Sequence, residues 1–164
     1  MKRFFVFMFA LAYVTFVVGC ANTEAEKPAL GRAKGFQLED IKGNTVRLSD
    51  YKGKIIMLNF FATWCPPCKI EMPDFDAIQK EYEDNVKIIA IAVGNESVSR
   101  VRAFAEQNRL DFTIAVDKGE VAGLYGPIRA IPVTVIIDKD FNIAKRYIGL
   151  RPKRVFTADI EELL

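Results

Sequence analysis

Two cysteines separated by two prolines are the residues of this chain best suited to chemistry. Cys65-Pro66-Pro67-Cys68 follows an apolar run and opens a segment with helical periodicity, which predicts Cys65 at a helix N-terminus. Backbone N–H groups and the helix dipole stabilise a thiolate there, and the second sulfur lies three residues further on the same helical face. The pair therefore predicts a reversible dithiol, with Cys65 as the nucleophile and Cys68 as the resolving thiol.

Other uses of these cysteines fit the sequence less well. A purely structural disulfide of this spacing closes too small a loop to stabilise much. The chain has three Cys and no His, so a zinc site would need carboxylates or a second subunit. Haem attachment needs His where Lys69 stands, and only Met72 is near enough to assist a soft metal. We therefore expect no metal and no cofactor beyond a redox-active Cys65–Cys68 disulfide.

Length and charge limit the remaining classes of protein. The 164 residues suit one domain plus an appendage. Lys2 and Arg3 alone account for the formal net charge of +2, which leaves the rest of the chain near neutral. Nothing in this balance indicates a nucleic-acid surface, and we expect no nucleic-acid partner.

The first 20 residues have the pattern of an export signal. A basic start precedes the apolar segment 4–18, which as a helix spans about 22 Å, short of the hydrocarbon core of a bilayer. The segment ends in Val-Val-Gly-Cys20, which resembles a bacterial lipobox. We predict a signal peptide at 1–19 and lipidation of Cys20; the alternative is an uncleaved anchor in which Cys20 is incidental. Either attaches the domain to a membrane outside the cytoplasm.

A polar stretch separates this signal from the domain. Residues 21–34 are small and polar and include Pro and Gly, as in a flexible tether or an ordinary disordered tail. We therefore divide the chain into a signal peptide at 1–19, a lipidated Cys and tether at 20–34, and one domain at 35–164.

Hydrophobic periodicity predicts an α/β domain. A hairpin is expected from 36–38 and 45–48, followed by strands at 55–61, 86–93, 112–116, 133–137 and 143–148. Helices are expected at 65–84, after the cap Ser97, at 120–125 and at 153–164. This order predicts a mixed central sheet with helices on both faces.

The residues around the dithiol resemble the thioredoxin superfamily and, more narrowly, the membrane-tethered TlpA/ResA-type oxidoreductases. The resemblance is carried by 58–68 (LNFFATWCPPC), by Glu71 and Pro73, and by 128–132 (IRAIP), which is similar to the superfamily segment with a cis-proline opposite the dithiol. It covers 35–164 and implies a three-layer thioredoxin-like fold with an extra N-terminal hairpin. This combination is more specific than a lone C-x-x-C.

The resemblance also implies roles for individual residues. Glu71, one helical turn beyond Cys68, is implied to handle the proton of that thiol; the alternative is a solvated helix residue. Asn59 stands where thioredoxin has a buried Asp, but an amide cannot take a proton, so we expect a satisfied buried amide at a strand end.

Three further residues are expected to bind the substrate. Trp64 either shields the dithiol and offers partners an apolar surface or packs in the core. A cis bond before Pro132 would leave the Ile131 backbone free to pair with an extended substrate segment. The alternative is an ordinary trans-proline entering a strand.

These residues together predict a thiol-disulfide oxidoreductase. The TlpA/ResA-type resemblance implies that the protein reduces disulfides of exported proteins, with apocytochrome c as the usual substrate class. We expect a monomer. A reductant in an oxidising compartment must be recharged, which implies a membrane thiol donor as a partner. A disulfide oxidase or isomerase would use the same residues at another reduction potential. A thiol peroxidase would need Thr or Ser where Ala62 stands, and a non-catalytic binding lipoprotein is a further alternative.

Overall fold

The computed structural model describes residues 30–164. The predicted signal peptide, Cys20 and the tether up to residue 29 lie outside the described residues. No helix within 30–164 is long and apolar enough to cross a bilayer.

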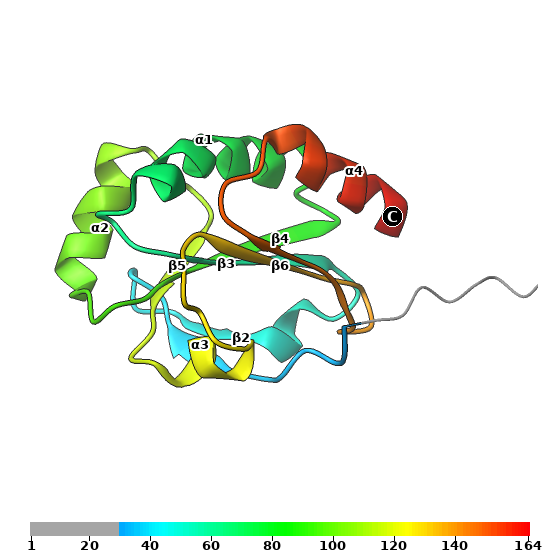
Figure 1. Cartoon of the computed structure of the whole chain (residues 1–164), viewed down its shortest axis with the longest axis horizontal. Coiled ribbons are helices and arrows are strands. Elements are labelled where there is room, and N and C mark those ends of the chain that lie inside the picture. Colours follow the sequence, from blue (N-terminus) through cyan, green and yellow to red (C-terminus); the bar gives the residue numbers. More distant parts are fainter. Residues whose placement is uncertain (1–29) are drawn as a thin grey trace, which may run out of the picture.

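A five-stranded mixed sheet forms the centre of the domain (Figure 1). Its order is β5 (Thr113–Val116), β4 (Val86–Ala92), β3 (Ile55–Phe61), β6 (Val133–Ile137) and β7 (Ile143–Ile148). Strand β3 runs parallel to β4 and antiparallel to β6. Every residue of β3 is buried, as its run of apolar residues, interrupted only by Asn59, predicts for a strand covered on both faces. The predicted mixed central sheet is confirmed.

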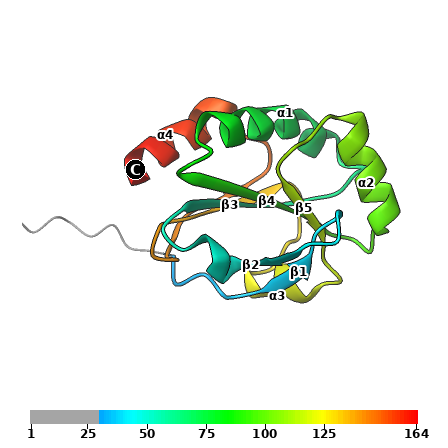
Figure 2. The same cartoon turned by 180° about the vertical axis from the view of Figure 1, so that it is seen from behind.

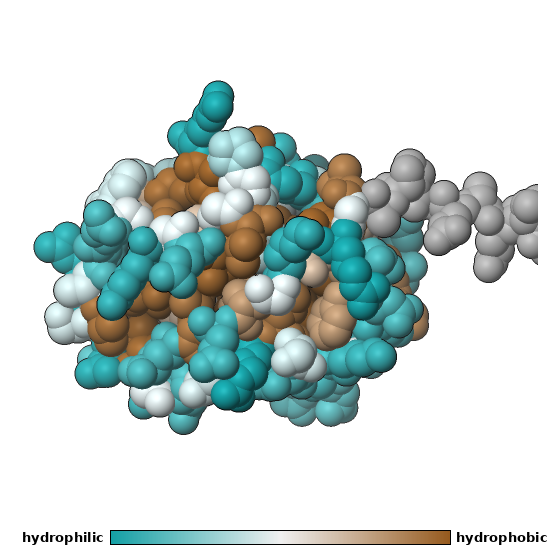
Figure 3. Space-filling model, turned by 90° about the horizontal axis from the view of Figure 1, so that it is seen from below, coloured by the Kyte–Doolittle hydropathy of each residue, from teal (hydrophilic) through white to brown (hydrophobic). Residues whose placement is uncertain are grey.

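Two further layers cover the sheet (Figures 1 and 2). One consists of α1 (Pro66–Glu81), α2 (Val98–Gln107) and α4 (Lys153–Leu163), which pack on a core that includes Met57 and Phe61. The other consists of α3 (Glu120–Leu124), the 3-10 helix Leu48–Tyr51, and the antiparallel pair β1 (Gln37–Glu39) and β2 (Thr45–Arg47). Figure 3 shows this second face, where hydrophobic residues remain visible between hydrophilic ones. The three-layer fold with an extra N-terminal hairpin is thus confirmed.

Most element boundaries agree with the sequence pattern. Strands β3, β6 and β7 have the predicted bounds, and the Ser97 hydroxyl caps α2 by accepting from the backbone N–H of Arg100. Helix α1 ends three residues earlier than predicted. It ends at Glu81 because the chain turns at Tyr82, whose carbonyl accepts from the N–H groups of Asn85 and Val86 instead of continuing the helix.

The first described residues join the sheet at the start of β7. The N–H of Leu30 donates to the carbonyl of Ile143 at 2.9 Å, and the N–H of Ile143 donates to the carbonyl of Gly31 at 2.8 Å. The chain therefore enters the domain beside the turn between β6 and β7.

Candidate active site

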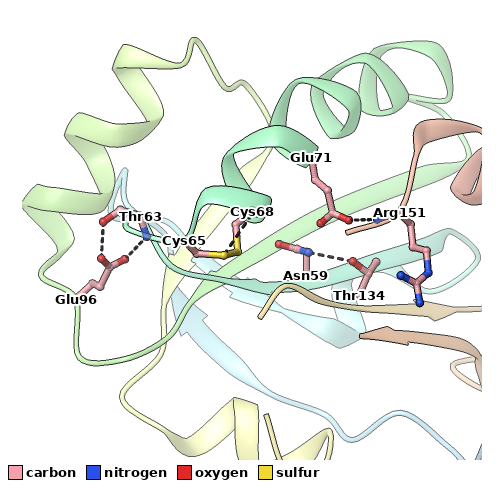
Figure 4. The surroundings of a disulfide bond; sticks show 8 residues. All are labelled: Asn59, Thr63, Cys65, Cys68, Glu71, Glu96, Thr134 and Arg151. Atoms are coloured by element: carbon pink, nitrogen blue, oxygen red, sulfur yellow. Dashed lines mark hydrogen bonds between the residues drawn. A yellow bond between two sulfur atoms is a disulfide. The ribbon is translucent and has the colours of Figure 1, made fainter. Parts of the chain in front are cut away.

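The two cysteines lie where the central strand β3 passes into helix α1. Cys65 has extended backbone angles and is the N-cap of α1; its Sγ accepts from the N–H of Cys68 at 3.3 Å. The two residues form a disulfide with their Cα atoms 5.3 Å apart, and both are buried (Figure 4). Pro66 and Pro67 occupy the first two helical positions and have no N–H, so the N–H of Cys68 is the first donor that the helix can offer Cys65.

The loop before Cys65 is held by a residue that the sequence reasoning did not identify. Thr63 donates its backbone N–H to Glu96 Oε2 at 2.9 Å and its hydroxyl to Glu96 Oε1. Glu96 lies in the loop between β4 and α2 and is only 8% exposed. No local signal marks this pair, because the two residues are 33 positions apart and meet only through the β3–β4 pairing.

Glu71 is buried behind Cys68 on the inner face of α1. Its side chain is 1% exposed, so the alternative of a solvated helix residue is wrong. Oε1 accepts from the backbone N–H of Arg151 at 2.7 Å, while Oε2 has no hydrogen-bond partner. Burial raises the pKa of Glu71 from 4.5 to about 7; the N–H and the charge of Arg151 oppose this rise, and the charge of Asp74 adds to it.

Asn59, inside strand β3, has a hydrogen-bond partner for only one of its two amide atoms. Its Nδ2 donates to Thr134 Oγ1 at 3.0 Å, whereas its Oδ1 has no partner although the residue is fully buried. The expectation of a satisfied buried amide is therefore wrong for Oδ1. Figure 4 shows Asn59 and Glu71 next to one another, from the sheet and the helix, on the Cys68 side of the disulfide.

The three residues expected at the substrate surface lie as follows. Trp64 is 62% exposed, so the core alternative is wrong. The bond between Ile131 and Pro132 is cis, so the trans-proline alternative is wrong as well. Ile131 packs against the core cluster that contains Cys65 and Cys68. Within residues 30–164, the backbone N–H and C=O of Ile131 take part in no hydrogen bond.

No group of three or more Cys, His, Asp or Glu residues in the described part of the chain is arranged to hold a metal ion. The two cysteines are joined by a disulfide. In the described domain they form a closed pair at the start of a helix, with a buried carboxyl group of raised pKa behind the second sulfur.

A mixed sheet, a disulfide at the N-terminus of a covering helix and a cis-proline together define a thioredoxin-like protein. The chain belongs to the AhpC/TSA family, whose pattern matches residues 31–146. It is 37% identical over 133 residues to the thiol-disulfide oxidoreductase ResA of Bacillus anthracis, covering 79% of this chain and 76% of that protein.

Solved structures agree with this assignment. A thiol:disulfide interchange protein, described as a putative DsbE, from Chlorobium tepidum matches with a TM-score of 0.76 and 28% identity, over 83% of this chain and 97% of that one. The exposed lipoprotein thioredoxin of Streptococcus pneumoniae matches with a TM-score of 0.70 and 31% identity, over 79% of this chain and all (100%) of that one. This chain is accordingly an enzyme, a thiol-disulfide oxidoreductase that acts on disulfide substrates.

Proposed function

We propose that this oxidoreductase reduces disulfides of exported proteins by exchange at Cys65 and Cys68. The observation that carries the proposal is the closed pair at the N-terminus of α1, where Cys65 Sγ accepts from the Cys68 N–H. In the reduced enzyme, the Cys65 thiolate attacks a sulfur of the partner disulfide; a mixed disulfide forms and one partner thiolate leaves and takes up a proton. Cys68 then attacks Cys65 Sγ and releases the second partner thiol. Two electrons pass from the dithiol to the partner.

Glu71 is proposed as the group that removes the proton from Cys68 before this second attack. Cys68 is fully buried, so water does not reach its sulfur freely. A carboxyl group with a pKa near 7 gives and takes a proton at neutral pH with little cost in free energy. Glu71 follows Cys68 by one turn of α1, and Figure 4 shows both side chains on the inner face of the helix.

The substrate is proposed to bind across Trp64, Ile131 and Pro132. Trp64 precedes the nucleophile and presents an apolar side chain to solvent. The free backbone groups of Ile131 suit an extended partner segment, which would add to the protein as a strand adds to a sheet edge.

The domain is proposed to lie outside the cytoplasm, attached to a membrane through lipidated Cys20. The apolar segment 4–18 and the Cys that follows it support this proposal, as does the likeness to a pneumococcal protein named an exposed lipoprotein. Metabolic labelling with palmitate tests it: the mature protein should incorporate the label and Cys20→Ala should not. Label that survives Cys20→Ala would contradict lipidation at this residue.

Apocytochrome c is the proposed substrate, since its haem-binding thiols must be free, and a membrane thiol donor is the proposed source of electrons. The test is trapping with Cys68→Ala, which stops the reaction at the mixed disulfide. Exported proteins, apocytochrome c among them, should be captured through Cys65 and released by reductant. The matched control Cys65→Ser should capture none. Capture of no exported protein by Cys68→Ala would refute the proposed reductase.

The geometry does not favour a thiol peroxidase. Ala62 stands where such an enzyme needs a hydroxyl, and the neighbouring hydroxyl of Thr63 is bound to Glu96. We expect no turnover of hydrogen peroxide.

A further inference from the structure

Two buried side-chain oxygens in the described part of the chain have no hydrogen-bond partner, and both lie beside the disulfide. They are Asn59 Oδ1 and Glu71 Oε2. Asn59 comes from β3 and Glu71 from α1, and Figure 4 shows them facing the same space behind Cys68. A buried acceptor without a donor is unfavourable, so two of them beside one disulfide call for an explanation.

The remaining atoms of both side chains are already held. Glu71 Oε1 accepts from the backbone N–H of Arg151, and Asn59 Nδ2 donates to Thr134 Oγ1. In the orientation shown, Nδ2 donates to the Thr134 hydroxyl and Oδ1 faces the helix. The free oxygen of each group is therefore the one that points into the shared space. A hydroxyl also donates, so a flipped amide would accept from Thr134 and turn Nδ2 toward Glu71, where it would stabilise the carboxylate; that alternative predicts that loss of Asn59 raises the pKa of Glu71.

A single proton satisfies both oxygens. A protonated carboxyl group carries an O–H donor, and an amide oxygen is an acceptor with two lone pairs. We propose that Asn59 is a positioning residue: its Oδ1 accepts from protonated Glu71 Oε2, directly or through one water molecule, and so keeps the Glu71 proton on the side of Cys68. This inference rests on the proposed role of Glu71 and adds a second residue to it.

The proposal assigns a path to the proton during resolution. The Cys68 thiol gives its proton to ionised Glu71 Oε2, and the Cys68 thiolate attacks Cys65 Sγ. The proton then rests between Glu71 and Asn59. The backbone N–H of Arg151 holds Oε1 throughout, so Oε2 is the oxygen that gains and loses the proton. Arg151 and Asp74 are the charged groups that act on Glu71 from the β7–α4 loop and from α1.

The experiment is an NMR titration of the Glu71 carboxyl carbon in the oxidised protein, which requires no substrate. Asn59→Leu removes the acceptor and keeps the site apolar, so the hydrogen bond to the neutral carboxyl is lost and the pKa of Glu71 should fall by about one unit. A merely structural role for Asn59 predicts the opposite or no change, because an apolar neighbour further disfavours the charged carboxylate. The control Thr134→Ser keeps the acceptor for Nδ2 and should leave the titration unchanged.

An unchanged or raised pKa of Glu71 in folded Asn59→Leu would overturn the proposal. A measurement on the unsubstituted protein covers the case in which this variant does not fold. The infrared carbonyl band of protonated Glu71, assigned by its loss in Glu71→Gln, should have the frequency of a hydrogen-bonded acid. A band of a free acid would overturn the proposal too.

Kinetics separate this inference from the role proposed for Glu71 itself. In Asn59→Leu, the rise of resolution rate with pH should move to lower pH by the same amount as the Glu71 titration. If the titration moves but Glu71→Gln resolves mixed disulfides at the wild-type rate, the hydrogen bond exists and the proposed catalytic role of Glu71 is wrong.

Discussion

Thr63 and Glu96 join the active-site loop to the loop after β4 by two hydrogen bonds to one carboxylate. Thr63 stands two residues before Cys65, and Glu96 stands directly before the cap of α2. The position of the nucleophile thus depends on a residue from a different βα loop of the same sheet.

Thr63→Val should destabilise the domain through this pair. The variant removes the hydroxyl and leaves one oxygen of a buried carboxylate without a donor, which costs about 1–3 kcal/mol. Thr63→Ser keeps the hydroxyl and should lose less than half as much. Urea unfolding of the two oxidised variants measures the difference, and a Val variant as stable as the Ser variant would show that the hydroxyl bond contributes nothing.

The free energy of unfolding of the oxidised protein should fall as pH rises because of Glu71. Its pKa is about 7 in the folded protein and 4.5 when exposed, so the folded state binds the proton more tightly. The contribution is fully present below pH 4.5 and is lost as pH rises to 7 and above, by about 2–3 kcal/mol between pH 5 and 8. Glu71→Gln keeps an acceptor for the Arg151 N–H and should lack this loss. Denaturant unfolding at several pH values measures the difference. If the free energies of unfolding of the wild type and of Glu71→Gln changed equally between pH 5 and 8, the raised pKa of Glu71 would be contradicted.

The prolines of the motif should limit how acidic Cys65 is. An N-cap side chain accepts from the N–H of the second or third helical residue, and Pro67 removes the second of these donors. Pro67→Ala restores that donor and should lower the pKa of Cys65 in the reduced enzyme by about 0.5–1 unit. Pro66→Ala restores the first N–H, which does not bond the cap, and is the matched control. Alkylation rates measured against pH report both values, and equal pKa values in the two variants would count against this account.

The same shortage of donors favours a reducing couple. A dithiol whose thiolate is strongly stabilised is a strong oxidant, whereas Cys65 has one backbone donor in this structure. We expect a reduction potential near that of thioredoxin, about −270 mV, and well below the value of about −120 mV that is found for a strongly oxidising dithiol protein. Equilibration with glutathione buffers measures it. A potential near the higher value would favour the oxidase alternative over the proposed reductase.

Trp64→Ala should separate substrate binding from stability. Because Trp64 is 62% exposed, its loss should change the free energy of unfolding by no more than about 0.5 kcal/mol. Reduction of a protein disulfide should slow several-fold, while reduction of a small disulfide should not. Leu164→Ala, at the far end of α4 and 48% exposed, is the control for removing an exposed apolar side chain. If Trp64→Ala and the wild type reduced protein disulfides at equal rates, Trp64 would not be part of the proposed substrate-binding surface.

The sequence predicted the elements well because each depends on local pattern. Strand β3 is apolar at every position except Asn59, and Ser97 is a cap; both appear where the pattern places them. Local pattern does not determine the end of α1, because Tyr82 and the residues after it suit a helix as well as a turn, and long-range packing decides between them.

The surroundings of the dithiol could be predicted in part. Glu71 is marked by its spacing from Cys68, but its partner Arg151 lies 80 residues further along the chain and bonds it through the backbone, which no residue type reveals. The role of Glu96 could not be predicted for a related reason. A lone acidic residue in a loop is normally exposed to solvent, and only the folded structure shows that Glu96 is buried. The free oxygen of Asn59 likewise follows from the positions of Thr134 and Glu71, which only the assembled sheet and helix define.

The backbone pairing of Leu30 with Ile143 places the start of the domain at the opposite end of the sheet from the dithiol. It lies where β3 begins, and the dithiol lies just beyond where β3 ends, so the seven residues of that strand separate the two by about 20 Å. The chain thus enters the domain at one end of the sheet, and the residues that exchange electrons lie at the other end. A group joined to the chain at residue 30 would therefore lie at the opposite end of the domain from the dithiol.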